Sequence, residues 1–177
     1  MQKMFACSGD LFFVYIQMNK INTEIQMIQD GHRDQAIILL NQFFSLVNSL
    51  PLDGIFEVRP NAARKMIDTF LKLQGTDKVC FAGVFQESEL LSMIIGRIEE
   101  RPFLKEERIL YIDTAVTKKG HMKKGYMSLL LKYAEGWCRK RKVPVIELRA
   151  LKANSPAVSY WKDSGFEEFY IRFRRKV

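Results

Sequence analysis

A basic, glycine-containing loop runs into an apolar helical segment in the second half of the chain. The stretch GHMKKGYMSLLLKYAEG (120–136) joins the two, and four lysines accompany its first glycines: Lys118, Lys119, Lys123 and Lys124. The first N–H groups of a helix lack intrahelical partners and carry partial positive charge, so they bind anions. A glycine beside them lets the backbone approach a ligand closely. The pattern indicates a phosphate-binding helix N-terminus, and the alternative is a tight basic turn.

The net charge of the chain, +8 over 177 residues, gathers in this one region. Nine lysines and arginines and a single acid, Glu135, lie between residues 118 and 142, and the rest of the chain is neutral. Such an excess suits an acidic ligand, an acidic partner or a nucleic acid, and it is also typical of a solvated helix face. Nucleic acid is the weakest of these hypotheses, because the chain has no zinc finger and no aromatic-plus-basic sheet signature.

The remaining composition is that of one globular domain in a reducing compartment. Hydrophobic residues make up 47% of the chain and charged residues 27%, so a core can form. The three cysteines (Cys7, Cys80, Cys138) are widely spaced and only two histidines are present, so we expect neither disulfides nor a metal site. No apolar run approaches the ~20 residues of a membrane span. We therefore expect a cytoplasmic protein that does not insert into a membrane.

The first residues are expected to lie outside the domain. Their one apolar patch, Leu11–Ile16, is short for a signal peptide, and Met18 offers a second start. The prediction is an N-terminal extension over residues 1–17, whose order the sequence does not specify, and a single domain over residues 18–177.

Hydrophobic periodicity predicts an alternation of strands and helices. The expected strands are 23–31, 78–86, 89–100, 107–116, 143–151 and 166–177, and the expected helices are 33–50, 62–73, the segment opening near Gly125, and 155–165. Short links among the three middle strands imply an antiparallel meander. A helix separates strand 107–116 from strand 143–151, so these two are expected to pair in parallel. The result is a mixed sheet with helices on both faces.

Two motifs over residues 107–170 resemble those of the GNAT N-acetyltransferase superfamily. One is a strand ending in Val, a basic loop and Gln/Arg-x-x-Gly-x-Gly/Ala at a helix start; here it is AVTKKGHMKKGYMSLLL, in which Gly125 matches. The other is Asn-x-x-Ala, an aromatic pair and Gly-Phe; here it is NSPAVSYWKDSGF. The second motif matches at six positions: Asn154, Ala157, Tyr160, Trp161, Gly165 and Phe166.

The resemblance implies the fold and the cofactor. The fold is α/β, with a mixed, mostly antiparallel central sheet, helices on both faces and a splayed parallel strand pair. Acetyl-CoA would be the co-substrate, with its pantetheine arm in the gap between the splayed strands and the Val116 N–H facing the thioester carbonyl. The residues implied to bind the cofactor are Ala115, Val116, Met122, Lys123, Lys124, Gly125, Tyr126, Met127, Asn154 and Trp161. Met122 and Met127 depart from the family's Gln/Arg and Gly/Ala, and Asn154 is equally suited to cap a helix.

The implied reaction is direct transfer of acetyl to an amine in a ternary complex. Asp113, three residues before Val116, is the best candidate for the general base; Glu99, Glu100 or a water chain are alternatives. The tyrosine that many relatives use as acid falls here on Trp161, whose indole is no acid. Tyr160 is the substitute, although helix geometry directs it toward the core. The thiolate could also take its proton from water.

The acceptor and the assembly are not specified by the sequence. A small-molecule amine and a protein amino group both fit, and dimers are common in the family, so a homodimer is one expectation. A non-catalytic CoA-binding or regulatory module is the alternative to an enzyme, because Trp161 and Met122 depart from the family pattern.

Overall fold

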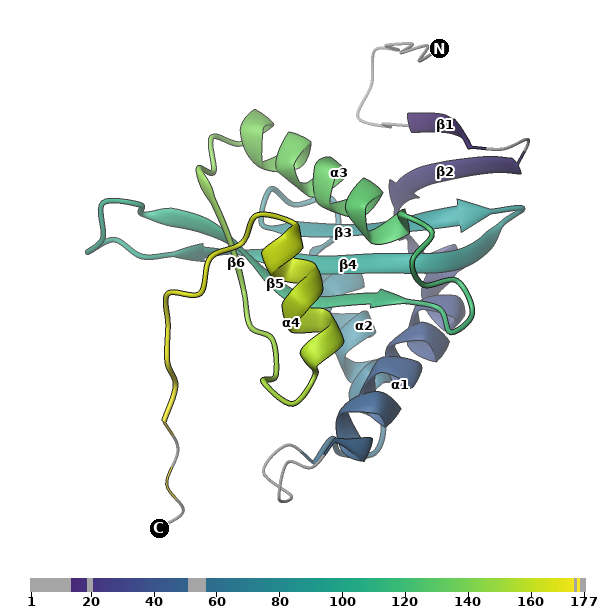
Figure 1. Ribbon diagram of the computed structural model, residues 1–177. Coiled ribbons are helices and arrows are strands. Elements are labelled where there is room, and N and C mark those ends of the chain that lie inside the picture. Colours follow the sequence, from purple (N-terminus) through teal and green to yellow (C-terminus); the bar gives the residue numbers. More distant parts are fainter. Residues whose placement is uncertain (1–13, 19–20, 51–56, 174, 176–177) are drawn as a thin grey trace.

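A six-stranded sheet forms the centre of the computed structural model, which describes residues 14–18, 21–50, 57–173 and 175 (Figure 1). The strands lie side by side in chain order, and every neighbouring pair is antiparallel except the last, β5 and β6. Their bounds are β1 Val14–Met18, β2 Ile21–Met27, β3 Val79–Gln86, β4 Glu89–Glu100, β5 Arg108–Thr117 and β6 Val145–Leu148. The mixed α/β fold and the single parallel pair predicted from the sequence are thus confirmed.

Four α-helices cover the two faces of the sheet (Figure 1). They are α1 Arg33–Ser49, α2 Ala62–Leu73, α3 Tyr126–Lys140 and α4 Ser155–Asp163, and a 3₁₀ turn, Asp30–His32, leads into α1. α3 packs on one face through the apolar stripe seen in the sequence, which includes Leu130, Ala134 and Trp137. α1 and α2 pack on the other face through Leu40, Ile67 and other apolar residues. Each sheet face therefore has its own apolar layer.

The N-terminal edge of the sheet has a strand that hydrophobic periodicity alone did not predict. β1 pairs with β2 from Val14↔Ile25 to Met18↔Ile21. It spans the domain boundary placed between residues 17 and 18, which stays a prediction; residues 1–13 lie outside the described residues.

The last predicted strand, 166–177, is not confirmed. No strand forms within residues 164–173, and this segment leaves α4 and runs away from the sheet (Figure 1). Its large apolar side chains are solvent-exposed: Phe169, Tyr170, Ile171 and Phe173. Alternating hydrophobicity creates a strand only where a neighbouring strand supplies hydrogen bonds and a buried face. In the described part of the chain this segment has neither.

The β3–β4 hairpin turns on two residues in the left-handed region. Glu87 and Ser88 have φ of 49° and 67°, as a two-residue type I′ turn requires. Both residues have a Cβ, which makes this conformation unfavourable by roughly 1–2 kcal/mol for each of them. The pairing of the largely buried strands β3 and β4 thus holds Glu87 and Ser88 in a strained backbone conformation.

Replacing Ser88 by glycine should stabilise the protein. Ser88→Gly relieves the positive φ, and we expect the free energy of unfolding to rise by about 0.5–1 kcal/mol, measured by urea denaturation. The matched control is Ser45→Gly, at an exposed position inside α1, which should lower it by a similar amount. A loss of stability in both variants would contradict the strained-turn interpretation.

Candidate active site

The parallel strands β5 and β6 separate part-way along β5. Their pairing runs from Ile109↔Val145 to Ile112↔Leu148 and stops there, while β5 continues to Thr117. At the same point the register of β5 against β4 shifts, because Ile95 faces Thr114 and Gly96 faces Ile112, so Asp113 is one residue too many. An extra residue of this kind is a β-bulge, and it bends and twists the strand. The bulge at Asp113 therefore marks where the sheet opens.

The hydrogen-bond register decides which backbone groups face the opening. In an antiparallel pair, a residue directs its N–H and C=O to the same neighbouring strand, and residues alternate. The Lys118 N–H donates to Leu91 O of β4 at 2.8 Å, and counting back by twos places Val116 and Thr114 on the β4 side as well. Ala115 and Thr117 consequently direct their backbone groups to the open edge.

This parity corrects the role expected for Val116. Its carbonyl accepts a hydrogen bond from the Ser92 Oγ at 3.0 Å on β4, and its side chain is buried in the layer under α1 and α2. A ligand lying along the open edge would meet the N–H of Ala115 in place of that of Val116. The role of Val116 was implied by the family motif, which does not specify the hydrogen-bond register of the strand.

The N-terminus of α3 lies beyond the end of β5 and is uncapped. Gly125 occupies the N-cap position with φ of 81°, and among the described residues no side chain caps the helix. Nothing lies within 4 Å of the place where a Cβ of Gly125 would stand. Tyr126 is buried, and Met127 is half-buried against the layer under α3. Met127 thus turns into the core, as its position in the motif requires, and leaves the helix mouth clear.

The basic loop before α3 is fixed at its root and exposed at its tip. The Lys118 ammonium pairs with Glu89, and the Lys119 N–H donates to the Gln42 Oε1 of α1 at 3.3 Å. Lys123, with φ of 61°, and Lys124 are exposed, and within the described residues neither forms an ion pair. Met122 is 61% exposed and so does not block the helix from within. Of the four lysines, only Lys118 forms an ion pair within the described residues, and Lys123 and Lys124 directly precede the free N–H groups of α3.

α4 brings its aromatic pair to the first turn of α3. Asn154 caps α4, since its Oδ1 accepts from the Ala157 N–H at 3.4 Å. The Tyr160 hydroxyl lies 3.3 Å from the Ser128 Oγ of α3, and the ring is half-buried outside both core layers. The expectation that Tyr160 faces the core is wrong: the short α4 has no buried residues. Trp161 is half-buried and meets the rings of Tyr160 and Phe166 edge-on.

Asp113 sits in a cluster of charged and aromatic side chains beside the bulge. Its Oδ1 accepts from Arg97, while its Oδ2 is buried without a hydrogen-bond partner among the described residues. Arg149 donates to the Tyr111 hydroxyl, and both arginines lie over the Tyr111 ring. Burial raises the pKa of Asp113 above its usual range, and Arg97 offsets part of that rise. A carboxylate with a raised pKa is a stronger base.

The alternative bases are placed differently. Glu99 accepts from Arg101, which also makes a bidentate pair with Glu147 of β6 at 2.7 and 2.8 Å. Glu100 is exposed at the end of β4. Since Glu99 and Glu100 lie at the paired end of β4 and β5, the structure groups only Asp113 with the opening.

Sequence reasoning missed three contacts of this region. Ser128, the partner of Tyr160, looks like a plain helix residue, and Arg97 and Gln42 lie far along the chain from the groups that they hold. The usable signal was the spacing of Ser128 from Gly125, which puts a hydroxyl in the first turn of the helix.

The raised pKa of Asp113 predicts a stability difference that depends on pH. At a pH between the ordinary and the raised pKa, the Asp113 carboxyl is protonated in the folded chain and ionised in the unfolded chain. The free energy of unfolding therefore falls as pH rises from the ordinary pKa to the raised one. Asp113→Asn removes that fall. Its unfolding free energy relative to the parent protein should therefore increase with pH, in urea denaturation between about pH 3.5 and 6.

Asp68 provides the control of opposite sign. Hydrogen bonds from Arg33, at 2.7 and 3.1 Å, lower its pKa, so the parent protein gains stability from it as pH rises. Asp68→Asn should therefore lose stability relative to the parent protein as pH rises toward the ordinary pKa of the carboxyl, which requires urea denaturation from about pH 2 to 4.5. Parallel curves for the two variants would contradict the assignment for Asp113.

Within the described ranges, no helix has the length and apolarity needed to cross a membrane.

Comparison with known proteins identifies the fold. A family model described as "Acetyltransferase (GNAT) family" matches residues 45–166. A search of curated protein sequences gives no match.

Solved structures match over most of both chains. AAC(6')-Iy, in complex with the bisubstrate analog CoA-S-monomethyl-acetylneamine, is 13% identical, with a TM-score of 0.69 over 88% of this chain and 98% of its own. A possible acetyltransferase from Clostridium difficile 630 is 17% identical, with a TM-score of 0.68 over 88% and 97%. A mutant BH1408 protein from Bacillus halodurans is 14% identical, with a TM-score of 0.74 over 86% and 98%. At these identities the likeness concerns the fold.

Proposed function

The chain belongs to the acetyltransferase (GNAT) family, and we propose that it transfers acetyl from acetyl-CoA to an amine in a ternary complex. The observation that carries the proposal is the opening between β5 and β6, with an uncapped helix N-terminus at its end. A thioester arm and a pyrophosphate need these two features: an unpaired strand edge and free N–H donors. The acceptor is a small-molecule amine or a protein amino group.

The residues at the opening fit the co-substrate. Gly125 leaves open space at the start of α3, and Lys123 and Lys124 add positive charge for phosphate oxygens. Ala115 and Thr117 present backbone groups that can pair with an extended pantetheine arm. Asn154 stands at the start of α4, where its side chain caps the helix. Acetyl-CoA would supply an activated acyl group and a thiolate leaving group.

The chemistry that we assign to the chain involves three groups. Asp113 takes the proton of the acceptor ammonium, after which the amine nitrogen attacks the thioester carbonyl carbon. The Ala115 N–H donates to the oxygen that becomes negative in that step. As the C–S bond breaks, the Tyr160 hydroxyl gives its proton to the sulfur. The nitrogen, which becomes the amide, loses its second proton, and this proton restores the Tyr160 hydroxyl through solvent. Side-by-side binding of the two reactants supplies much of the rate enhancement.

A non-catalytic CoA-binding module is the second candidate. Trp161 stands at the position where many relatives have a tyrosine that acts as the acid. Because an indole cannot act as that acid, Trp161 favours the non-catalytic module. Tyr160 argues for the enzyme, because its hydroxyl reaches Ser128 in the first turn of α3. Thiol release with a panel of amines separates the two: binding of acetyl-CoA without turnover would support the module.

A side chain at position 125 should weaken acetyl-CoA binding. Gly125→Ala and Gly75→Ala both place a Cβ at a φ near +80°, and neither Cβ meets a neighbour within 4 Å. Both should therefore lose about 1 kcal/mol of stability. Only Gly125→Ala narrows the helix mouth, so it alone should weaken acetyl-CoA binding, by about tenfold or more in calorimetry. Equal affinities for both variants, or no binding by the parent protein, would overturn the assigned phosphate site.

The acid and base should be separable by kinetics. Asp113→Asn and Tyr160→Phe should each lower kcat/KM by about 10²-fold or more, measured as thiol release with an accepted amine. Asp113→Asn should also remove the acidic limb of the pH–rate profile. Tyr170→Phe, at an exposed position in the C-terminal segment, is the matched control and should leave kcat/KM unchanged. If Tyr160→Phe behaves like Tyr170→Phe, the thiolate takes its proton from water.

A further inference from the structure

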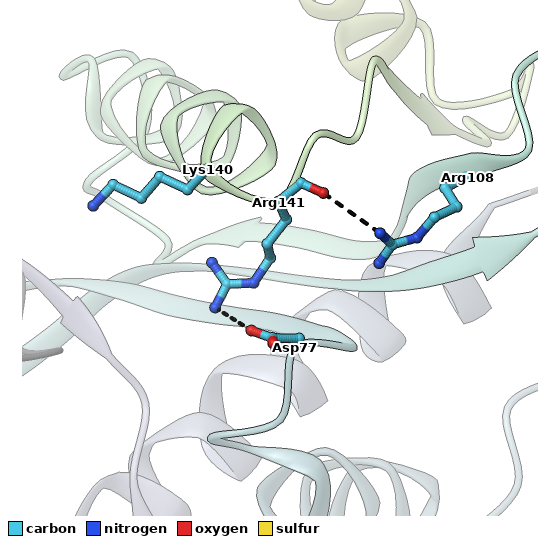
Figure 2. A pocket seen from close by; sticks show the side chains of 4 residues that line it. All are labelled: Asp77, Arg108, Lys140 and Arg141. Atoms are coloured by element: carbon cyan, nitrogen blue, oxygen red, sulfur yellow. Dashed lines mark hydrogen bonds and ion pairs between the residues drawn. The ribbon is translucent and has the colours of Figure 1, made fainter.

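A second group of basic side chains lines a cavity at the other end of α3 (Figure 2). Arg108 comes from the start of β5, Lys140 and Arg141 from the end of α3, and Asp77 from the loop before β3. The cavity has a volume of about 360 Å³, at the lower end of the roughly 300–1,000 Å³ of small-molecule sites. α3 has 15 residues, so the cavity lies about 22 Å along the helix from Gly125. It is therefore distinct from the opening between β5 and β6.

Arg108 and Arg141 lie close together, and the cavity lining contains one carboxylate for these two positively charged side chains. The Arg108 Nη1 donates to the Arg141 carbonyl at 3.4 Å (Figure 2). The Arg141 guanidinium stacks 4.1 Å from the centre of the Trp137 ring. Asp77 is the single acid that lines the cavity, and it pairs with Arg141 at 2.9 Å. The two guanidinium groups thus face a single carboxylate among the side chains that line the cavity. A phosphate dianion carries two negative charges, one for each guanidinium group.

Both guanidinium groups also retain unused donors. The Nε atoms of Arg108 and Arg141 are buried, and neither has a hydrogen-bond partner among the described residues. A buried polar group without a partner is costly, so natural proteins seldom leave one. A ligand oxygen that reached either Nε–H would supply the missing partner. Arginine presents these donors as a planar fork that matches phosphate oxygens.

Two features oppose an anion here, and neither outweighs the arginines. The Asp77 side chain is 82% exposed, so its ion pair with Arg141 stabilises by at most about 1 kcal/mol and is readily exchanged. The C-terminus of a helix has about half a negative charge, against the two full positive charges of the guanidinium groups. Its carbonyls are also engaged, since Cys138 O accepts from the Val143 N–H and Arg139 O from the Lys142 N–H.

We propose that this cavity binds a phosphate dianion, free or as the terminal group of a phosphomonoester, separately from any ligand at the N-terminus of α3. The inference rests on the cavity and its arginines and does not depend on the acetyl-transfer function.

Trp137 provides the readout for a test. The chain has two tryptophans, so Trp161→Phe leaves Trp137, beneath Arg141, as the only one. Inorganic phosphate, glycerol phosphate and acetate are titrated into this protein at constant ionic strength, and the tryptophan fluorescence is followed. We expect a saturable change with phosphate, none with acetate, and the same response when acetyl-CoA is present. Tighter binding of glycerol phosphate would identify a phosphomonoester as the ligand, and equal or weaker binding would identify free phosphate.

Three variants locate the binding. Arg108→Gln and Arg141→Gln should each weaken phosphate binding by about tenfold or more, whereas Lys142→Gln, which removes the adjacent cation outside the cavity, should not. Because Arg141→Gln also alters the environment of Trp137, calorimetry with phosphate provides a second measurement for all variants. The proposal fails if phosphate does not saturate below about 50 mM, if acetate binds as well as phosphate, or if Arg108→Gln binds phosphate like the parent protein.

Discussion

The separation of β5 from β6 is the constraint on which the rest of the candidate site depends. One extra residue, Asp113, shifts the register of β5, and the parallel ladder ends beside it at Ile112↔Leu148. A sheet that stayed paired to the end of β5 would have no free edge to offer. The bulge therefore creates the opening and fixes which backbone groups face it. The bulge also places the half-buried carboxylate of Asp113 beside the opening, where Arg97 donates to one of its two oxygens.

The order of the elements along the chain places α3 at the end of β5 and brings α4 into contact with α3. α3 follows β5, so the loop between them delivers Gly125 to the end of the strand, and α4 follows β6 and reaches α3 through Tyr160 and Ser128. The core explains why this geometry is rigid. α3 is anchored by a continuous apolar stripe, while its first turn carries no cap that a ligand would have to displace. Packing energy thus holds the backbone donors in place before any ligand arrives.

Local sequence patterns predicted the elements well and the contacts between them poorly. The α3 stripe, the β3–β4 hairpin and the parallel pairing of β5 and β6 were all predicted from periodicity and chain order. The side to which Val116 directs its backbone was not, because the family motif does not specify the hydrogen-bond register of the strand, which depends on its pairing with β4. Tyr160 was misplaced because α4 has no buried face, and the strand at 166–177 was misplaced because pairing depends on a neighbour that its own residues do not encode.

Two kinds of group attract an anion to the start of α3: the lysines of the basic loop and the first N–H groups of the helix. Lys123 and Lys124 are exposed, so their field is screened over about 8 Å at physiological ionic strength. The N–H groups of the helix act at hydrogen-bond distance, where dissolved ions have little effect. Added salt should therefore slow the capture of an anionic ligand more than it speeds release. The lysines govern how quickly a ligand arrives, and the helix governs how long it stays.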